Sequence, residues 1–144
     1  MLLPLIHIVV PVRELLEEAT VGEKIAFYRF KADLTQEELA ERLNIDRKTI
    51  LRYENGTMKL NLRIINEIAE QLKIPPTFLY DDYFSFLAYP YSEKIKEILS
   101  DNCISTKKLA ELVFVHNKTI KRWKKQVIPP NRENYEKLKE LNLV

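Results

Sequence analysis

Three cationic side chains lie close together in one short segment, and their spacing suits hydrogen bonding to a polyanion. Arg47, Lys48 and Arg52 alternate there with the apolar pair Ile50 and Tyr53. On a helix, positions three and four apart share a face, so the cations lie opposite the apolar pair. Arginine presents a fork of donors that fits a guanine edge, and lysine can bond phosphate oxygens. The pattern indicates recognition by charge and hydrogen bonding.

Two short helices joined by a tight turn are predicted to position these side chains. Thr35 and Glu38 match a capping box at the start of the first helix. Asn44 falls where the chain must reverse, and asparagine tolerates the left-handed conformation better than most residues. Asp46 is expected to cap the second helix, and Gly56 to end it at the C′ position. Such a helix-turn-helix presents its second helix to the major groove of DNA.

The chain from Gly22 to about Leu87 resembles the XRE family of phage-repressor and Cro-type helix-turn-helix domains. The matching segments, in order, are Gly22–Ile25, Leu34–Ala40, Ile50–Gly56 and Ile65–Leu72. The resemblance implies a five-helix fold and double-stranded DNA as partner. It implies that Gln36 and Asn55 approach phosphates and that base edges are faced by Arg47, Lys48, Leu51 and Arg52. For Leu51 two interpretations stay open: contact with a thymine methyl group, or no contribution. The predicted contacts of this domain are Gln36, Arg47, Lys48, Thr49, Leu51, Arg52, Asn55 and Lys59.

An internal repeat with a spacing of 70 residues runs through most of the chain. Shifting the sequence by 70 positions, without a gap, gives 12 identical pairs over the 48 columns from residue 23 to residue 70. Identical segments include Glu23–Ile25 with Glu93–Ile95 and Lys48–Ile50 with Lys118–Ile120. Such self-similarity predicts a second copy of the same supersecondary unit.

We therefore predict an all-α fold of two tandem helix-turn-helix domains with a short N-terminal extended arm. The arm comprises residues 1–19, the five-helix domain 20–88, a linker 89–91 and a smaller second domain 92–144. The expected helices lie near 21–32, 35–43, 46–55, 62–72, 76–87, 92–101, 105–113, 117–126 and 131–142. Pro90 breaks the helical pattern between the domains.

The second domain is more basic than the rest of the chain. Residues 91–144 hold 12 Lys or Arg and 7 Asp or Glu, whereas residues 1–90 hold 11 and 14. Its predicted DNA contacts are Lys107, Asn117, Lys118, Lys121, Arg122, Lys124 and Lys125. Such a cluster predicts phosphate contacts and salt-dependent affinity, whether or not bases are read.

The second copy of the repeat has diverged at its turns. Phe114 stands where the first copy has Asn44, so a different turn geometry is expected. Gln126 replaces the closing Gly56. The stretch 119–130 is also similar to excisionase or MerR-like winged helix-turn-helix units.

The composition offers little for catalysis or metal binding. The chain has one cysteine, Cys103, two histidines, His7 and His116, and two glycines. One cysteine excludes an internal disulfide and a cysteine-based zinc site, and two glycines leave no phosphate-binding loop. We predict no enzyme activity, metal or cofactor, and we expect Cys103 to be a small buried apolar residue.

The apolar segment 2–12 is shorter than the ~20 residues that span a bilayer. It has no positive region before it and no small-residue cleavage site after it, so a cytoplasmic location is predicted. Alternation over 6–10 predicts a short strand, which needs a partner. Two interpretations stay open for this arm and for the aromatic run 78–91: packing within the chain, or self-association into a homodimer.

The leading functional hypothesis is a sequence-specific transcriptional regulator, in the role of a repressor, that reads DNA through the helices near 46–55 and 117–126. The alternative is a protein-interaction module of antitoxin or antirepressor-like type, in which the second domain binds a protein. Phe114 and the aromatic run 78–91 favour that alternative. Co-purification of a partner without retention of DNA would distinguish the two.

Overall fold

The computed structural model describes residues 16–144, and all regular structure within that range is helical. The predicted arm lies outside the described residues over positions 1–15, including the strand expected at 6–10. The described chain divides into two compact units, the first ending at Tyr80 and the second running from Asp81 to Val144. The predicted all-α class is thus confirmed.

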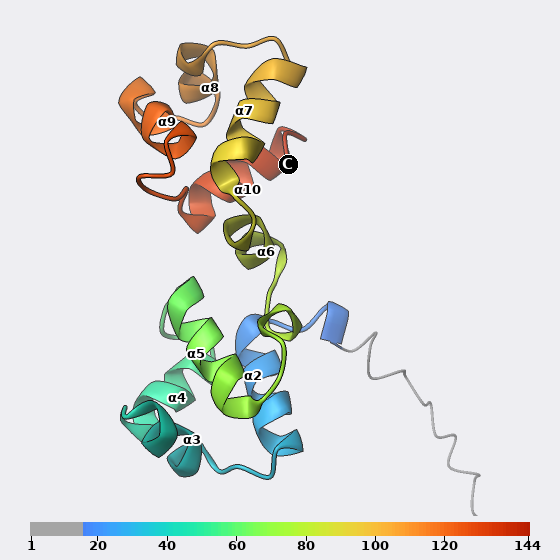
Figure 1. Cartoon of the computed structure of the whole chain (residues 1–144), viewed down its shortest axis with the longest axis vertical. Coiled ribbons are helices and arrows are strands. Elements are labelled where there is room, and N and C mark those ends of the chain that lie inside the picture. The colour runs from blue at the N-terminus through green and yellow to red at the C-terminus, as the bar shows by residue number, and fades with distance from the viewer. Residues whose placement is uncertain (1–15) are drawn as a thin grey trace, which may run out of the picture. The chain divides into compact units, whose positions relative to one another are not determined.

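Over residues 21–80, the first unit has four α-helices and a short 3-10 helix (Figure 1). They are α2 (Val21–Lys31), α3 (Gln36–Leu43), α4 (Arg47–Glu54), α5 (Leu62–Leu72) and η1 (Pro76–Phe78). Each α-helix places at least one fully buried residue in the core: Ile25 in α2, Leu39 in α3, Ile50 in α4 and Ile65 in α5. Helix α4 packs against both α2 and α3, so its inner face is held from two sides.

The helix starts of the first unit are set by local hydrogen bonds. Thr20 and Glu23 form a capping box at α2, and Thr35 and Glu38 form another at α3, as their spacing predicts. The Thr35 backbone N–H donates to the Glu38 carboxylate at 2.7 Å, and this bond holds the pKa of Glu38 below its ordinary value. Each box satisfies N–H groups that a helix end leaves unpaired.

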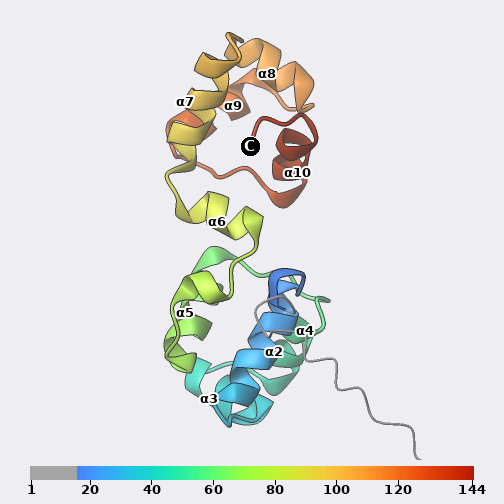
Figure 2. The ribbon, with the colours of Figure 1, turned by 90° about the vertical axis from the view of Figure 1, so that its right-hand side faces the viewer.

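The second unit consists of five α-helices (Figure 2). They are α6 (Asp82–Ala88), α7 (Tyr91–Asp101), α8 (Thr106–Leu112), α9 (Asn117–Lys124) and α10 (Arg132–Glu140). Its core includes Ile95, Leu109, Ile120, Trp123 and Leu138, all nearly or fully buried. The unit contains no strand, so the similarity of 119–130 to winged units does not extend to a wing.

The predicted fifth helix over 76–87 is two elements. The 3-10 turn η1 packs against α5 of the first unit. Asp81 accepts a hydrogen bond from the Phe84 N–H and starts the new helix α6. Phe86 of α6 lies in the core of the second unit. By its contacts the second unit therefore begins at Asp81, ahead of the predicted linker 89–91.

The turn between α8 and α9 has the same backbone as the turn between α3 and α4. Phe114 has φ 57° and Asn44 has φ 54°, both left-handed. Val115 N–H donates to the Ala110 carbonyl at 3.0 Å, as Ile45 N–H donates to the carbonyl five residues before it at 3.0 Å. The expectation that Phe114 changes the turn is wrong, because the backbone bond sets the conformation in spite of the bulky side chain.

Two further left-handed positions recur after 70 residues. Asp33 and Cys103 follow α2 and α7 with φ 54° and 51°. Gly56 and Gln126 follow α4 and α9 with φ 75° and 56°. Cys103 is exposed, so the expected burial of this residue is wrong. Its place just past the end of α7 carries the side chain outward.

Candidate nucleic-acid interface

Helix α4 presents one polar face to solvent and one apolar face to the core. Ile50 is fully buried and Tyr53 is 6% exposed. Arg47, Lys48 and Arg52 are exposed on the other side. The two faces follow from the helical period, because 50 and 53 are three residues apart. The cations that the sequence singles out thus share one accessible surface.

The remaining candidates of the first unit differ in accessibility. Leu51 is 43% exposed and places an apolar surface among the cations. Thr49 is half-buried, and Asn55 and Lys59 are exposed. The Asn55 Oδ1 accepts from both the backbone N–H and the hydroxyl of Thr57, so this oxygen stabilises the end of α4.

The ends of α4 are held mainly by backbone geometry. Asp46 has the extended backbone of an N-cap, but its side chain makes no capping hydrogen bond. The predicted side-chain cap is therefore wrong, whereas the predicted position is right. Gly56 has φ 75° and lies at C′, and the Thr57 N–H reaches back to the Arg52 carbonyl at 3.0 Å.

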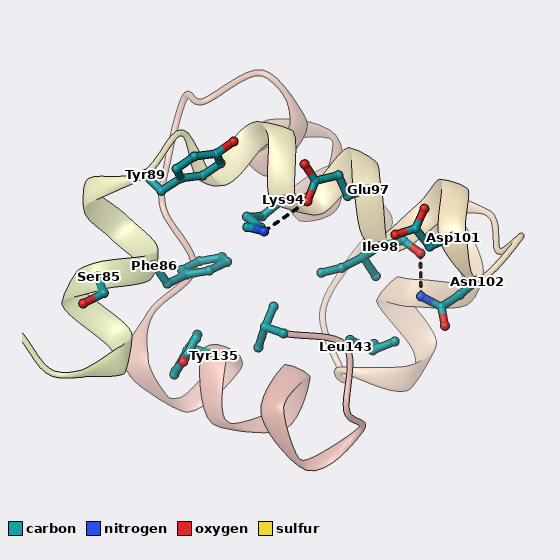
Figure 3. A pocket seen from close by; sticks show the side chains of 11 residues that line it. Ser85, Phe86, Tyr89, Lys94, Glu97, Ile98, Asp101, Asn102, Tyr135 and Leu143 are labelled. Atoms are coloured by element: carbon teal, nitrogen blue, oxygen red, sulfur yellow. Dashed lines mark hydrogen bonds and ion pairs between the residues drawn. The ribbon is translucent and has the colours of Figure 1, made fainter. Parts of the chain in front are cut away.

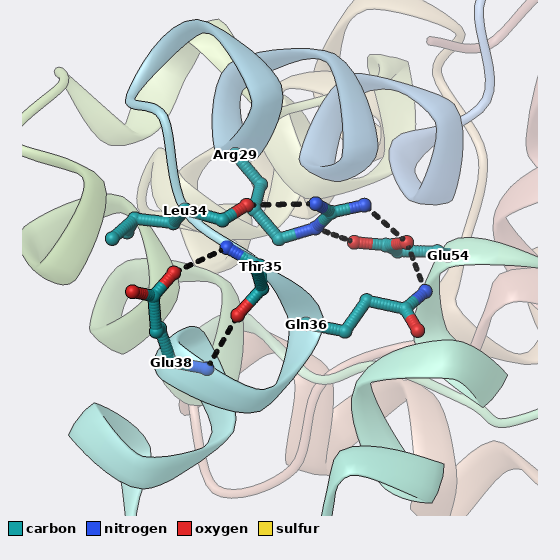
Figure 4. A network of polar contacts seen from close by, with 6 residues as sticks. All are labelled: Arg29, Leu34, Thr35, Gln36, Glu38 and Glu54. Atoms are coloured by element: carbon teal, nitrogen blue, oxygen red, sulfur yellow. Dashed lines mark hydrogen bonds and ion pairs between the residues drawn. The ribbon is translucent and has the colours of Figure 1, made fainter.

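A buried ion pair ties α4 to its neighbours (Figure 4). Arg29 of α2 and Glu54 of α4 are joined by a 2.6 Å bond from Nε to Oε1 and a 3.1 Å bond from Nη2 to Oε2. Their side chains are 7% and 8% exposed. The Arg29 Nη1 also donates to the Leu34 carbonyl. This bidentate geometry fixes both side chains.

Gln36 completes the network from the first turn of α3. Its Nε2 donates to the Glu54 Oε2 at 2.7 Å. A phosphate contact by Gln36 would therefore use the second hydrogen of that amide. The sequence interpretation missed this network. No local pattern joins Arg29 with a residue 25 positions away, and the repeat has Leu99 and Lys124 in their places.

Helix α9 repeats the two-faced pattern in the second unit. Ile120 is fully buried and Trp123 is 1% exposed. His116 caps the helix, because its Nδ1 accepts from the Lys118 N–H at 3.1 Å. Of the predicted contacts, Lys107 on α8 and Lys118, Lys121, Arg122 and Lys125 are exposed, while Asn117 and Lys124 are half-buried. The accessible part of α9 is thus strongly cationic.

Asn117 is oriented differently from the other candidates. Its Oδ1 is buried and has no hydrogen-bond partner within residues 16–144. Reading an adenine edge with asparagine takes both the oxygen and the nitrogen of the amide. In this orientation Asn117 cannot make that bidentate contact.

A hollow of about 650 Å³ lies on another face of the second unit (Figure 3). Phe86, Ile98, Tyr135 and Leu143 line it, and the Lys94–Glu97 ion pair lies at its edge. Its lining includes no residue of α8 or α9. The hollow is therefore separate from the cationic face of α9.

Residues 16–144 contain neither a metal site nor a membrane span. No group of three or more His, Cys, Asp or Glu side chains in that range could hold a metal ion. No helix in the same range is both long and apolar enough to cross a bilayer.

Comparison with known proteins places residues 22–83 in a family described as a helix-turn-helix domain. An uncharacterized HTH-type transcriptional regulator of Methanocaldococcus jannaschii is 38% identical over 61 residues, covering 41% of this chain and 92% of the relative. Another such regulator, of Archaeoglobus fulgidus, is 36% identical over 61 residues, covering 41% and 86%. The phage CTXphi transcriptional repressor RstR of Vibrio cholerae is 31% identical over 79 residues, covering 55% and 71%. No solved structure matches the chain significantly.

Proposed function

The chain belongs to the helix-turn-helix domain family, and we propose that it is a DNA-binding transcriptional regulator that acts as a repressor by occupying an operator. The cationic face of α4 carries this proposal. Arg47, Lys48 and Arg52 are exposed together on a helix whose inner face packs against α2 and α3. A helix presented in this way fits the major groove, where arginine can bond guanine O6 and N7.

We propose further that the second unit is a diverged helix-turn-helix. Three observations support it: the left-handed turn at Phe114, the cap at His116 and the burial of Trp123 opposite the lysines. The turn and the buried aromatic ring recur 70 residues after Asn44 and Tyr53. The position before α9 repeats the extended N-cap backbone of Asp46, and only His116 adds a side-chain bond there. A duplex bound by both units would meet cations from α4 and from α9, and the cations of α9 would add strong phosphate contacts.

The first test compares Arg52→Gln with Lys73→Gln on a duplex selected by the full chain from a random pool. Lys73 is exposed at the end of α5 and lies outside the proposed interface. We expect Arg52→Gln to weaken binding of the selected duplex about ten-fold or more, since a bidentate contact is worth ~1–3 kcal/mol. Lys73→Gln should leave binding unchanged. Failure to enrich any sequence, or equal binding by both variants, would contradict the proposal.

Self-association is a finer proposal for the same regulator. Within the aromatic run 78–91, Phe84, Phe86 and Tyr91 are buried, while Phe78 and Tyr89 are each 49% exposed. A homodimer contact in this run would therefore use Phe78 and Tyr89. Sedimentation equilibrium of the full chain with and without Phe78→Ser and Tyr89→Ser tests this. A chain that is monomeric at all concentrations would exclude it.

A protein partner for the second unit is the second candidate function, and Phe114 favours it. This ring is 82% exposed on a residue with positive φ, so neither burial nor backbone preference accounts for phenylalanine there. Such an aromatic side chain suits an interface with another protein. Retention of a stable protein partner by the full chain, abolished in Phe114→Ser, together with no DNA binding at low salt, would favour this function over the first.

A further inference from the structure

The exposed faces of α4 and α9 share two cations and differ at a position between them. Lys48 and Arg52 are exposed, and each has an identical, exposed counterpart 70 residues later. Between them Leu51 is 43% exposed, and its counterpart is the exposed Lys121. Both helices have the same length of eight residues and the same backbone at the preceding turn. The substitution therefore changes the chemistry between two cations that both helices share.

The two side chains at this position favour different base pairs. Leu51 has no donor, and an apolar side chain in the major groove contacts the thymine methyl group. Lys121 is a donor, and its ammonium suits guanine O6 and N7. A leucine facing guanine would leave the base acceptors without a partner, and a lysine facing thymine would gain at most the single O4 acceptor.

A second difference lies at the first residue of each helix. Arg47 is exposed, whereas Asn117 is half-buried with its Oδ1 turned inward. The first residues of a recognition helix are among those that contact base edges. The α4 face therefore has an arginine reader there, and the α9 face has no counterpart to it.

We propose that the operator of this protein is composite, with two non-identical half-sites that differ at the base facing residue 51 in one half and residue 121 in the other. This inference rests on the proposed function and goes beyond it by naming the specificity-determining pair. The half bound by α4 carries a thymine at that position, and the half bound by α9 carries a guanine. The bases read by the common residues Lys48 and Arg52 recur in the second half.

The alternative arrangement is a palindromic operator bound by two copies of the same unit. There the two halves would be identical, since the same side chains would read both. Symmetry of the selected sequence therefore separates the two arrangements without any assumption about half-site spacing.

The test is selection of duplexes from a random pool by the full chain and by the variants Leu51→Lys and Lys121→Leu. Lys96→Leu is the matched control, because Lys96 is an exposed lysine of α7 outside the proposed interface. For the unaltered chain we expect a two-part consensus with unequal halves. Leu51→Lys should change thymine to guanine in one half, and Lys121→Leu should make the opposite change in the other.

Affinity gives a second measurement of the same pair. Leu51→Lys should bind the original duplex about ten-fold more weakly and recover on a duplex with guanine at that position. Identical halves, a consensus with only one half, or no base change in either variant would overturn the inference while leaving the regulator in place. No enrichment of any sequence by the unaltered chain would instead overturn the proposed function itself.

Discussion

At the scale of single residues, the Arg29–Glu54 pair links stability to the proposed reading surface. Both side chains are almost fully buried, and Glu54 is the last residue of α4. Buried ion pairs are weak evidence of net stabilisation, but the loss of one partner leaves the other charge without compensation. The same carboxylate also holds Gln36, so the pair positions a candidate phosphate contact.

We expect Glu54→Gln to lower the free energy of unfolding of the first unit by about 3 kcal/mol. Denaturation followed by far-UV circular dichroism measures it. Trp123, the only tryptophan of the sequence, lies in the second unit. Its fluorescence should therefore report an unfolding midpoint of that unit that the substitution leaves unchanged. Glu67→Gln is the control, since it breaks an exposed pair with Arg63 that is worth no more than about 1 kcal/mol. Equal effects of the two variants on the free energy of unfolding would show that burial of the Arg29–Glu54 pair does not make its loss more costly.

Phe114 is a residue whose conformation costs free energy. A left-handed backbone with a Cβ is disfavoured by roughly 1 kcal/mol, and asparagine bears this cost better than phenylalanine. We expect Phe114→Asn to raise the stability of the second unit by about 1 kcal/mol, as followed by Trp123 fluorescence. Tyr89→Asn removes a ring of the second unit that is 49% exposed and has a negative φ, and it should give no gain. A loss of stability in Phe114→Asn would mean that the ring contributes packing.

At the scale of elements, α4 and α9 share their architecture and differ in charge. Glu54 of α4 is neutralised by Arg29, whereas α9 and the residue after it carry five cations and no acid. Phosphate neutralisation releases counterions and makes affinity depend on salt. We therefore assign the larger share of the salt dependence to α9.

Neutralising Lys121, Lys124 and Lys125 to glutamine should reduce the slope of log affinity against log salt by about 2 to 3, at roughly 0.9 for each phosphate that the variant no longer neutralises. The control neutralises Lys94, Lys96 and Lys139, which pair with acids on α7 and α6. Titrations of the same duplex at several salt concentrations give both slopes. If the two triple variants had equal slopes, α9 would not contact the phosphate backbone.

Much of the helical pattern could be predicted from local signals. The capping boxes at Thr20 and Thr35, the reversal at Asn44 and the stop at Gly56 depend on a few neighbouring residues, so the bounds of α2 to α5 follow closely. The break at Asp81 was missed, because an aspartate inside an aromatic run caps a new helix only when that helix finds a core of its own, as α6 does through Phe86.

The candidate site was predictable in part. Exposure of Arg47 and Arg52 follows from the helical period. The engagement of Gln36 and the inward turn of Asn117 depend on distant side chains or on rotamers, which no sequence spacing encodes. The turn at Phe114 was misjudged because residue preference is weaker there than the backbone hydrogen bond across the turn.

At the scale of the whole molecule, one chain carries two units whose cationic helices have related but unequal faces. A single polypeptide would then distinguish the two orientations of an asymmetric operator. Such a regulator would have a defined orientation on the DNA, which a symmetric dimer with identical halves lacks.

The most direct measurement is methylation interference on the selected duplex with the full chain and with Arg52→Gln. Methylation of guanine N7 blocks the acceptor that an arginine in the major groove would use. We expect methylation at a discrete guanine to prevent binding by the unaltered chain, and the Arg52→Gln variant to be insensitive at that guanine. Binding that tolerates N7 methylation throughout the duplex would contradict the claim that α4 reads the major groove.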